Sequence, residues 1–219
     1  MRVRTEAKRD SILEIASVVF VEMGYERASM AAIAERVGGS KATLYGYFPS
    51  KEQLFVAVVH EQGKRHLEPA FDELVRSTDD AETTLRRFGE RYLGFITQPF
   101  AIAGYRMVIA ESGHSGFGKR FHEAGPKKSY ESIAAYLAAE MAAGRLRQAD
   151  ADAAADHLVG LLQSEVVPRL LLGLIDKVSR AQLKQVVARA VEVFLRAYAA
   201  EPEPEPKGAA ARSRSRSSP

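Results

Sequence analysis

The chain has 219 residues, with 31 Lys and Arg, 28 Asp and Glu, a formal net charge of +3 and no cysteine. This length suits one large or two small domains with their own hydrophobic cores, and the missing cysteines exclude thiol nucleophiles, thiolate metal sites and disulfides. The charge is unevenly distributed, since residues 1–51 carry +2, residues 52–200 are neutral and residues 201–219 carry +1. No apolar run reaches the ~18 residues of a membrane span and no secretory signal core follows the charged start, so we expect a cytoplasmic protein with no membrane partner.

Strong helix formers and helical periodicity fill most of the chain, and they predict an all-α fold of about nine helices. The first predicted helix covers about residues 5–23 and ends at Gly24. Apolar side chains recur on one face of it, at Ile12, Ala16, Val19, Phe20 and Met23. This pattern is typical of an amphipathic helix that packs on a core.

Two short helices are predicted next, on either side of a glycine turn. Ser29 and Ser40 are their expected N-caps, and Gly38 with Gly39 separates them. Two such helices are the arrangement of a helix-turn-helix, whose second helix enters the major groove of DNA. Leu44 is the expected inward anchor of that second helix.

A long fourth helix is predicted from Ser50, because Ser50 and Gln53 form a capping-box pattern. Five further helices follow, over about residues 79–97, 99–112, 116–143, 151–175 and 179–199. Beyond residue 200 the composition changes to Glu/Pro and then Arg/Ser, which favours disorder. The sequence therefore predicts a DNA-binding domain over residues 1–50, a second domain over 51–200 and a disordered tail over 201–219.

The stretch GGSKATLYGYFPSKEQLF, from Gly38 to Phe55, closely resembles the signature of the TetR family of bacterial transcriptional regulators. Gly24-Tyr25 and the segment 30–34 fit the same pattern. The resemblance implies an all-α fold in which three N-terminal helices bind DNA. It also implies that a larger helical domain dimerises and binds a small-molecule effector.

Three later segments resemble the AefR-like C-terminal domain found in one branch of that family. They are RMVIAE from Arg106, FHEAGP from Phe121 and GRL from Gly144. This resemblance extends the family assignment into the second predicted domain.

The family signature implies which side chains meet double-stranded DNA. They are Ser29, Ser40, Lys41, Thr43, Tyr45, Tyr47 and Lys51. Lys51 is expected to contact a phosphate at the positive end of the fourth helix. Gly46 stands where the family often has a larger residue, which weakens this helix by ~1 kcal/mol relative to alanine. Two alternatives to DNA contact stay open. Lys41 and Lys51 could be ordinary solvated side chains, and the rings of Tyr45 and Tyr47 could pack on the preceding helix.

The resemblance also places an effector cavity among aromatic side chains of the middle segment. The candidate cavity residues are Tyr92, Phe95, Phe100, Tyr105, Arg106, His114 and Phe121. Apolar pockets with a few polar groups suit small molecules. The alternative is an ordinary core, since an aromatic stripe at helical spacing is typical of one.

The last two predicted helices each carry an apolar face that we interpret as a homodimer interface. The interface candidates are Leu158, Leu161, Leu162, Leu183, Val187, Ala190, Val191 and Phe194. Pro168 is expected to kink the first of these helices. A two-fold dimer would present two recognition helices to a palindromic site. The alternative is that both faces only cover the core of one protomer.

The five histidines lack the i, i+4 spacing of helical zinc sites, so we expect no metal site. We also expect no cofactor and no enzyme activity, since no strand precedes Gly113-His114-Ser115-Gly116, which is therefore no nucleophile elbow. The sequence thus predicts a one-component transcriptional regulator, a repressor that a small-molecule effector releases from a palindromic operator. One alternative is a helical small-molecule-binding protein or hydrolase without specific DNA binding. Another is an activator or a sequence-tolerant architectural DNA binder.

Overall fold

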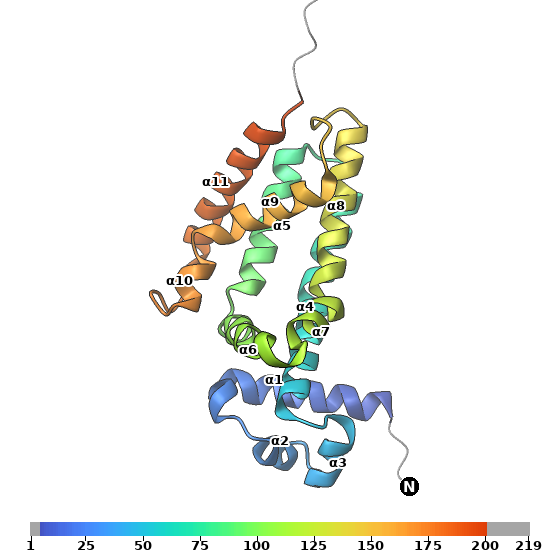
Figure 1. The fold of residues 1–219 in the computed structure, drawn as a ribbon, viewed down its shortest axis with the longest axis vertical. Coiled ribbons are helices and arrows are strands. Elements are labelled where there is room, and N and C mark those ends of the chain that lie inside the picture. Colours follow the sequence, from blue (N-terminus) through green and yellow to red (C-terminus); the bar gives the residue numbers. More distant parts are fainter. Residues whose placement is uncertain (1–4, 201–219) are drawn as a thin grey trace, which may run out of the picture.

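The computed structural model describes residues 5–200, except the side chains of His114 and Ser115. The predicted tail at 201–219 lies outside the described residues. Within the described range the fold is all-α, as predicted, and has eleven helices. Figure 1 shows a small N-terminal head below a larger helical body.

The head consists of α1 (Glu6–Arg27), α2 (Met30–Arg36) and α3 (Lys41–Tyr47). In Figure 1, α1 crosses beneath the body, and α2 and α3 lie on its far side. Buried side chains of all three helices, with Ile12, Ile33 and Leu44 at their centre, form one core cluster. Leu44 is 2% exposed, which confirms it as the inward anchor of α3.

The fourth helix, α4 (Lys51–Arg76), belongs to both parts of the molecule. Its first turns place Leu54, Phe55 and Val58 in the core of the head. Its later turns place Leu67 and Leu74 in the core of the body. A helix of 26 residues is ~39 Å long, so α4 spans the distance between the two cores.

Four long helices form the upper body, and two others connect the body to the head. The upper body contains α5 (Ala81–Ile96), α8 (Pro126–Ala142), α9 (Ala151–Ser164) and α11 (Arg180–Tyr198). The connecting helices are α6 (Pro99–Ser115) and α7 (Phe117–Ala124). Met107 of α6 and Phe117 of α7 are buried in the core cluster of the head, so head and body share a continuous apolar contact.

Helix α5 packs unusually close to its neighbours at Gly89. A Cβ atom there would lie 2.8 Å from Val187 Cγ1 and 2.9 Å from Leu162 Cδ2. Only glycine therefore fits without displacing two core side chains.

The structure breaks two helices that the sequence predicted as continuous. The predicted helix over 116–143 stops at Ala124, and α8 restarts with Pro126 in its first turn. The predicted helix over 151–175 ends at Ser164, and Pro168 stands in the first turn of the short α10 (Val167–Leu171). A proline ring collides with the preceding turn and lacks an N–H donor, so it begins helices more readily than it continues them. The expected nine helices thereby become eleven.

The first helix also runs further than predicted, because it resumes after Gly24 and ends at Arg27. Gly24 has φ +75°, a conformation that glycine adopts without strain. The bend leaves Tyr25 directed toward α4, where its ring lies 4.8 Å from that of Phe55.

The segment after α8 is fixed by a charged pair. Arg145 donates from Nε and Nη2 to the two carboxylate oxygens of Glu140, at 2.7 and 2.6 Å. Glu140 is one of the few buried polar side chains among the described residues, and Leu146 beyond it is 2% exposed. The GRL segment therefore closes the end of α8 and anchors the connection to α9.

Among residues 5–200, none of the helices is by itself long and apolar enough to cross a membrane. Helix α5 and the part of α6 over Pro99–Gly113 meet the length and composition together, but a bend of 72° separates them.

Candidate DNA-binding surface and ligand cavity

The second helix of the helix-turn-helix, α3, is held by its own cap and faces solvent on one side. Ser40 Oγ accepts a hydrogen bond from the Thr43 N–H at 3.1 Å and lies 2.9 Å from Thr43 Oγ1. Lys41 and Tyr45 are exposed, Tyr45 by 48%. With Leu44 buried behind them, these two side chains lie on the outer face of α3.

Ser29 and Tyr47 make contacts that shape the head. Ser29 is the N-cap of α2 and accepts from the Ala32 N–H at 3.1 Å. The Tyr47 hydroxyl accepts from the backbone N–H of Thr5 at 3.0 Å. Because Thr5 is the N-cap of α1, Tyr47 joins the end of α3 to the start of α1. Contact of either residue with DNA stays a prediction.

Lys51 lies half-buried between α1 and α4. Its ammonium donates to the carbonyl oxygens of Tyr25, at 3.1 Å, and Ala28, at 3.2 Å. It also lies 4.2 Å from the centre of the Tyr25 ring. The lysine thus caps the carbonyl end of α1, where a cation is favoured. Its contact with a DNA phosphate stays a prediction.

Tyr25 and Glu52 complete the same junction. The Tyr25 hydroxyl donates to Glu52 Oε1 at 3.3 Å. The pKa of Glu52 is lowered by its own backbone N–H and then by the hydroxyls of Ser50 and Tyr25. Burial raises the pKa of Tyr25, so its phenol remains a donor. The only sequence signal for this junction was the Gly24-Tyr25 pair, because contacts between residues 23 to 27 positions apart have no local periodicity.

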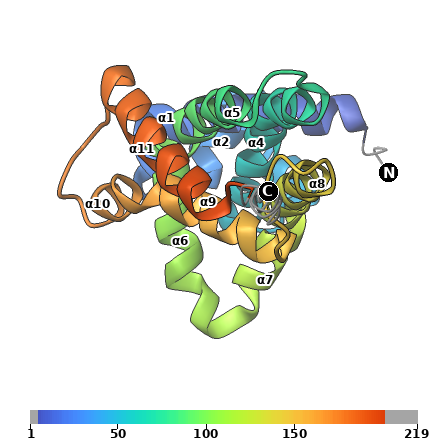
Figure 2. The same cartoon turned by 90° about the horizontal axis from the view of Figure 1, so that it is seen from above.

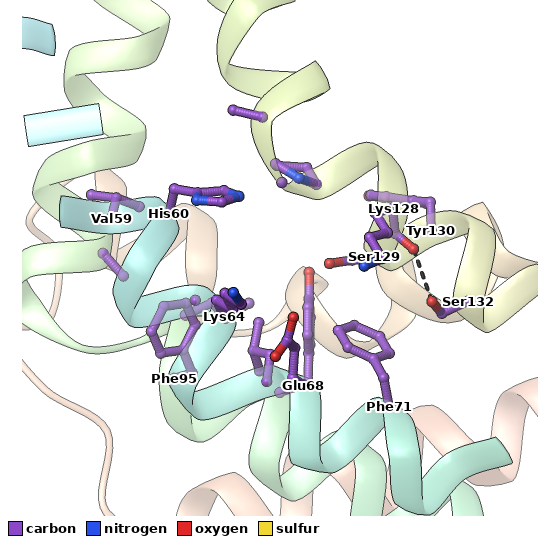
Figure 3. A pocket seen from close by; sticks show the side chains of 18 of the residues that line it. Val59, His60, Lys64, Glu68, Phe71, Phe95, Lys128, Ser129, Tyr130 and Ser132 are labelled. Atoms are coloured by element: carbon purple, nitrogen blue, oxygen red, sulfur yellow. Dashed lines mark hydrogen bonds between the residues drawn. The ribbon is translucent and has the colours of Figure 1, made fainter. Parts of the chain in front are cut away.

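A cavity of about 660 Å³ lies in the body, lined by α4, α5, α7, α8 and parts of α6 and α9. Figure 3 shows His60, Lys64, Glu68 and Phe71 of α4 facing Lys128, Ser129 and Tyr130 of α8 across it. Its volume is in the range of sites for drug-sized ligands. The body therefore has room for a small molecule.

Four of the seven candidate cavity residues line this cavity, namely Tyr92, Phe95, Tyr105 and Phe121. Phe100 is not among the lining residues, since it packs edge-on against Phe95 at 5.7 Å. The prediction was wrong for Arg106, which donates to the carbonyl oxygens of Leu170 and Leu171 at 2.7 and 3.0 Å. Arg106 thus caps the end of α10. The side chain of His114 lies outside the described residues.

Sequence reasoning missed the α4 and α8 walls of the cavity. The missed residues include His60, Gly63, Lys64, Glu68, Phe71, Lys128, Ser129 and Tyr130. Most of them are polar or small, so they lack the aromatic stripe that drew attention to α5 and α6.

The dimer prediction was wrong for six of its eight side chains. Leu158, Leu162, Val187, Ala190, Val191 and Phe194 are 0–5% exposed within a single chain. They pair α9 with α11 and α5 inside the protomer, which was the alternative that the sequence left open. Leu161 and Leu183 are half-buried.

Among the described residues, no three or more His, Asp and Glu side chains form a cluster suited to a metal ion.

A helix-turn-helix head with an exposed second helix, continuous with a helical body that holds a cavity, is the architecture of a one-component DNA-binding regulator. Comparison with known families agrees. Residues 83–200 match the family model of the AefR-like transcriptional repressor C-terminal domain. Residues 12–58 match that of the bacterial regulatory proteins of the tetR family. The chain belongs to the TetR family of bacterial transcriptional regulators.

Individual relatives are similar over different lengths. The HTH-type transcriptional activator FasR of Mycolicibacterium smegmatis is 36% identical over 111 residues, 49% of this chain and 48% of that protein. The chain thus spans about half or less of the curated relatives it matches. A solved structure from Mesorhizobium loti MAFF303099, described as a TetR-family transcriptional regulator, is 26% identical in sequence and has a TM-score of 0.78. The match covers 90% of this chain and 100% of that chain. The flavonoid-responsive regulator FrrA is 29% identical with a TM-score of 0.64, covering 89% and 98%.

Proposed function

We propose that this chain is a dimeric repressor that a small molecule releases from a palindromic operator in the cytoplasm. The observation that carries the proposal is the placement of α4. One end of this helix packs in the DNA-binding head, and its middle lines the cavity. A ligand that prefers one position of α4 shifts the population of head orientations, and with it the affinity for DNA.

The outer face of α3 supports the DNA-binding role. Lys41 provides a cation for phosphate or a guanine edge, and Tyr45 provides a ring and a hydroxyl. Duplexes selected from a random pool should converge on a two-fold sequence. Lys41→Ala and Tyr45→Ala should each weaken binding to it by about tenfold, since a good base or phosphate contact contributes ~1–3 kcal/mol. Lys184→Ala, an exposed lysine of α11, is the matched control and should have no effect. Failure to select any sequence would favour a ligand-binding protein without specific DNA binding.

The repressor role rests on the description of the family model that covers the body, an AefR-like transcriptional repressor. FasR is named an activator, so the direction of regulation needs its own test. Transcription in vitro from a promoter overlapping the selected operator should fall when the protein is added. A rise would make the chain an activator.

Dimerisation must use side chains that the protomer leaves exposed. Leu172 and Leu174 follow α10 and are 74% and 67% exposed, and Val193 of α11 is 51% exposed. Figure 2 shows α10 and the start of α11 at one edge of the molecule. Leu172→Glu with Leu174→Glu should convert the dimer to a folded monomer by light scattering, whereas Val75→Glu, an exposed apolar residue of α4, should not.

The effector role of the cavity is supported by its volume and by FrrA, whose name describes it as flavonoid-responsive. Gly63 offers a direct test, because a Cβ there would contact only Phe95, at 3.7 Å. Gly63→Ala should leave the response of operator binding to an effector intact. Gly63→Phe should fill the cavity and abolish that response while DNA binding without effector remains. An unchanged response of the Phe variant would exclude this cavity as the effector site.

A further inference from the structure

The inner and outer parts of the cavity differ in chemistry. The inner wall is apolar and aromatic, with Tyr92, Phe95, Ile133 and Val159 all buried. The charged side chains among the described lining residues are all exposed, at the mouth. These are Lys64, Glu68, Asp72, Glu123 and Lys128, and the imidazole of His60 is exposed beside them.

The inner end carries two neighbouring phenols, those of Tyr92 and Tyr105. The Tyr92 hydroxyl accepts a hydrogen bond from Gln163 Nε2 at 2.6 Å. Burial raises the pKa of Tyr92, Tyr105 and the neighbouring Tyr130, so all three phenols keep their protons at neutral pH. Tyr105 lines the cavity beside Tyr92, so its hydroxyl can donate to the oxygen of a ligand that lies there.

The charges at the mouth do not compensate a buried anion. Lys64 and Lys128 share the mouth with Glu68, Asp72 and Glu123, so the opening has no excess of positive charge. A carboxylate at the inner end would lose its hydration without gaining a cationic partner, which is costly. An uncharged oxygen there needs only a donor.

We propose that the cavity takes an uncharged aromatic compound whose carbonyl or ether oxygen accepts a hydrogen bond from Tyr105. The rings of Phe71, Tyr92 and Phe95 provide the surfaces for an aromatic ligand, and the volume of about 660 Å³ suits one of two to four rings. This inference rests on the proposed effector role of the cavity and specifies which chemistry it selects.

Three probes of nearly equal size test it, namely 2-acetonaphthalene, 2-naphthoate and 2-isopropylnaphthalene. They share a ring system and differ in carrying a neutral acceptor, a carboxylate or no acceptor. Isothermal titration of the full chain at neutral pH should show 2-acetonaphthalene binding about fivefold tighter than 2-isopropylnaphthalene, the effect of one neutral hydrogen bond. It should bind at least about tenfold tighter than 2-naphthoate.

A variant locates the donor. Tyr105→Phe should abolish the preference for 2-acetonaphthalene over 2-isopropylnaphthalene and leave the affinity for the latter within about twofold. Tyr45→Phe, on the exposed face of α3, is the control and should keep the preference. The proposal is overturned if 2-naphthoate binds as tightly as the ketone, if Tyr105→Phe keeps the preference, or if none of the probes binds. If 2-acetonaphthalene is preferred as expected but does not change the affinity for the operator, the proposed effector function is wrong and the proposed ligand class stands.

Discussion

Substituting Lys51 by methionine should destabilise the head without removing a phosphate contact. The change keeps the aliphatic stem but deletes two hydrogen bonds from a charged donor, at 3.1 and 3.2 Å, and a cation–π contact at 4.2 Å. Hydrogen bonds to charged groups contribute ~1.5–3 kcal/mol and an exposed cation–π contact ~0.5–1 kcal/mol. Since Lys51 is only half-buried, we expect a loss of about 2 kcal/mol in the free energy of unfolding. For a chain of this size the Tm should fall by about 4–8 °C.

Salt dependence separates this role from the one that the sequence predicted. Each phosphate contact adds ~0.9 to the slope of log affinity against log salt concentration. Titrations of a selected duplex over several salt concentrations should give the wild-type slope for Lys51→Met. The slope for Lys41→Met should be smaller by about two, since each protomer of the proposed dimer loses one contact. A Lys51→Met protein with unchanged Tm and a slope reduced by about two would refute the capping role.

Three further predictions concern stability. Gly89→Ala should lower the free energy of unfolding by about 1–2 kcal/mol because its Cβ would collide with two core side chains. Gly94→Ala on the same helix meets nothing within 4 Å and should raise the free energy of unfolding by up to ~1 kcal/mol. Equal effects of the two substitutions in urea denaturation would contradict the close crossing at Gly89. Arg145→Ala should lower the Tm by calorimetry more than Arg196→Ala, because only the former leaves a buried carboxylate unpaired; the reverse order would exclude this role. The pKa of Glu52 lies below 4.5 in the folded state, so its contribution is present above that pH and is lost as the pH falls through the folded pKa. Glu52→Gln should therefore weaken the loss of stability on acidification from pH 7 to about pH 3, and an equally steep loss in the variant would argue against the junction.

The sequence predicted the elements that local chemistry determines. Ser29, Ser40 and Ser50 are N-caps as expected, because a capping serine needs only backbone N–H groups three residues away. The family signature located the head for the same reason, since its glycine turn and short helices lie within one continuous segment.

Contacts between residues that are distant in the chain could not be predicted from the sequence. Lys51 and Arg106 each cap a helix that is remote in sequence, and nothing near them indicates which carbonyls they will meet. The apolar faces of α9 and α11 could cover a partner or a core, and periodicity does not distinguish the two. The structure decides, because α5 occupies the space against them through the close crossing at Gly89.

The burial of those two faces would make folding and the proposed dimerisation separate events. Leu158, Val191 and Phe194 already lie in the core of one protomer, so the proposed dimer would leave them unchanged. Dimerisation would still raise the unfolding midpoint by mass action, but the monomer should stay folded below the dissociation constant of the dimer, in contrast to obligate dimers. Subunits could also dissociate and recombine without unfolding, and mixed dimers with related chains would be limited by surface complementarity alone. Substitutions at the surface proposed for dimerisation would then leave the core intact, so they could change pairing specificity at little cost in stability.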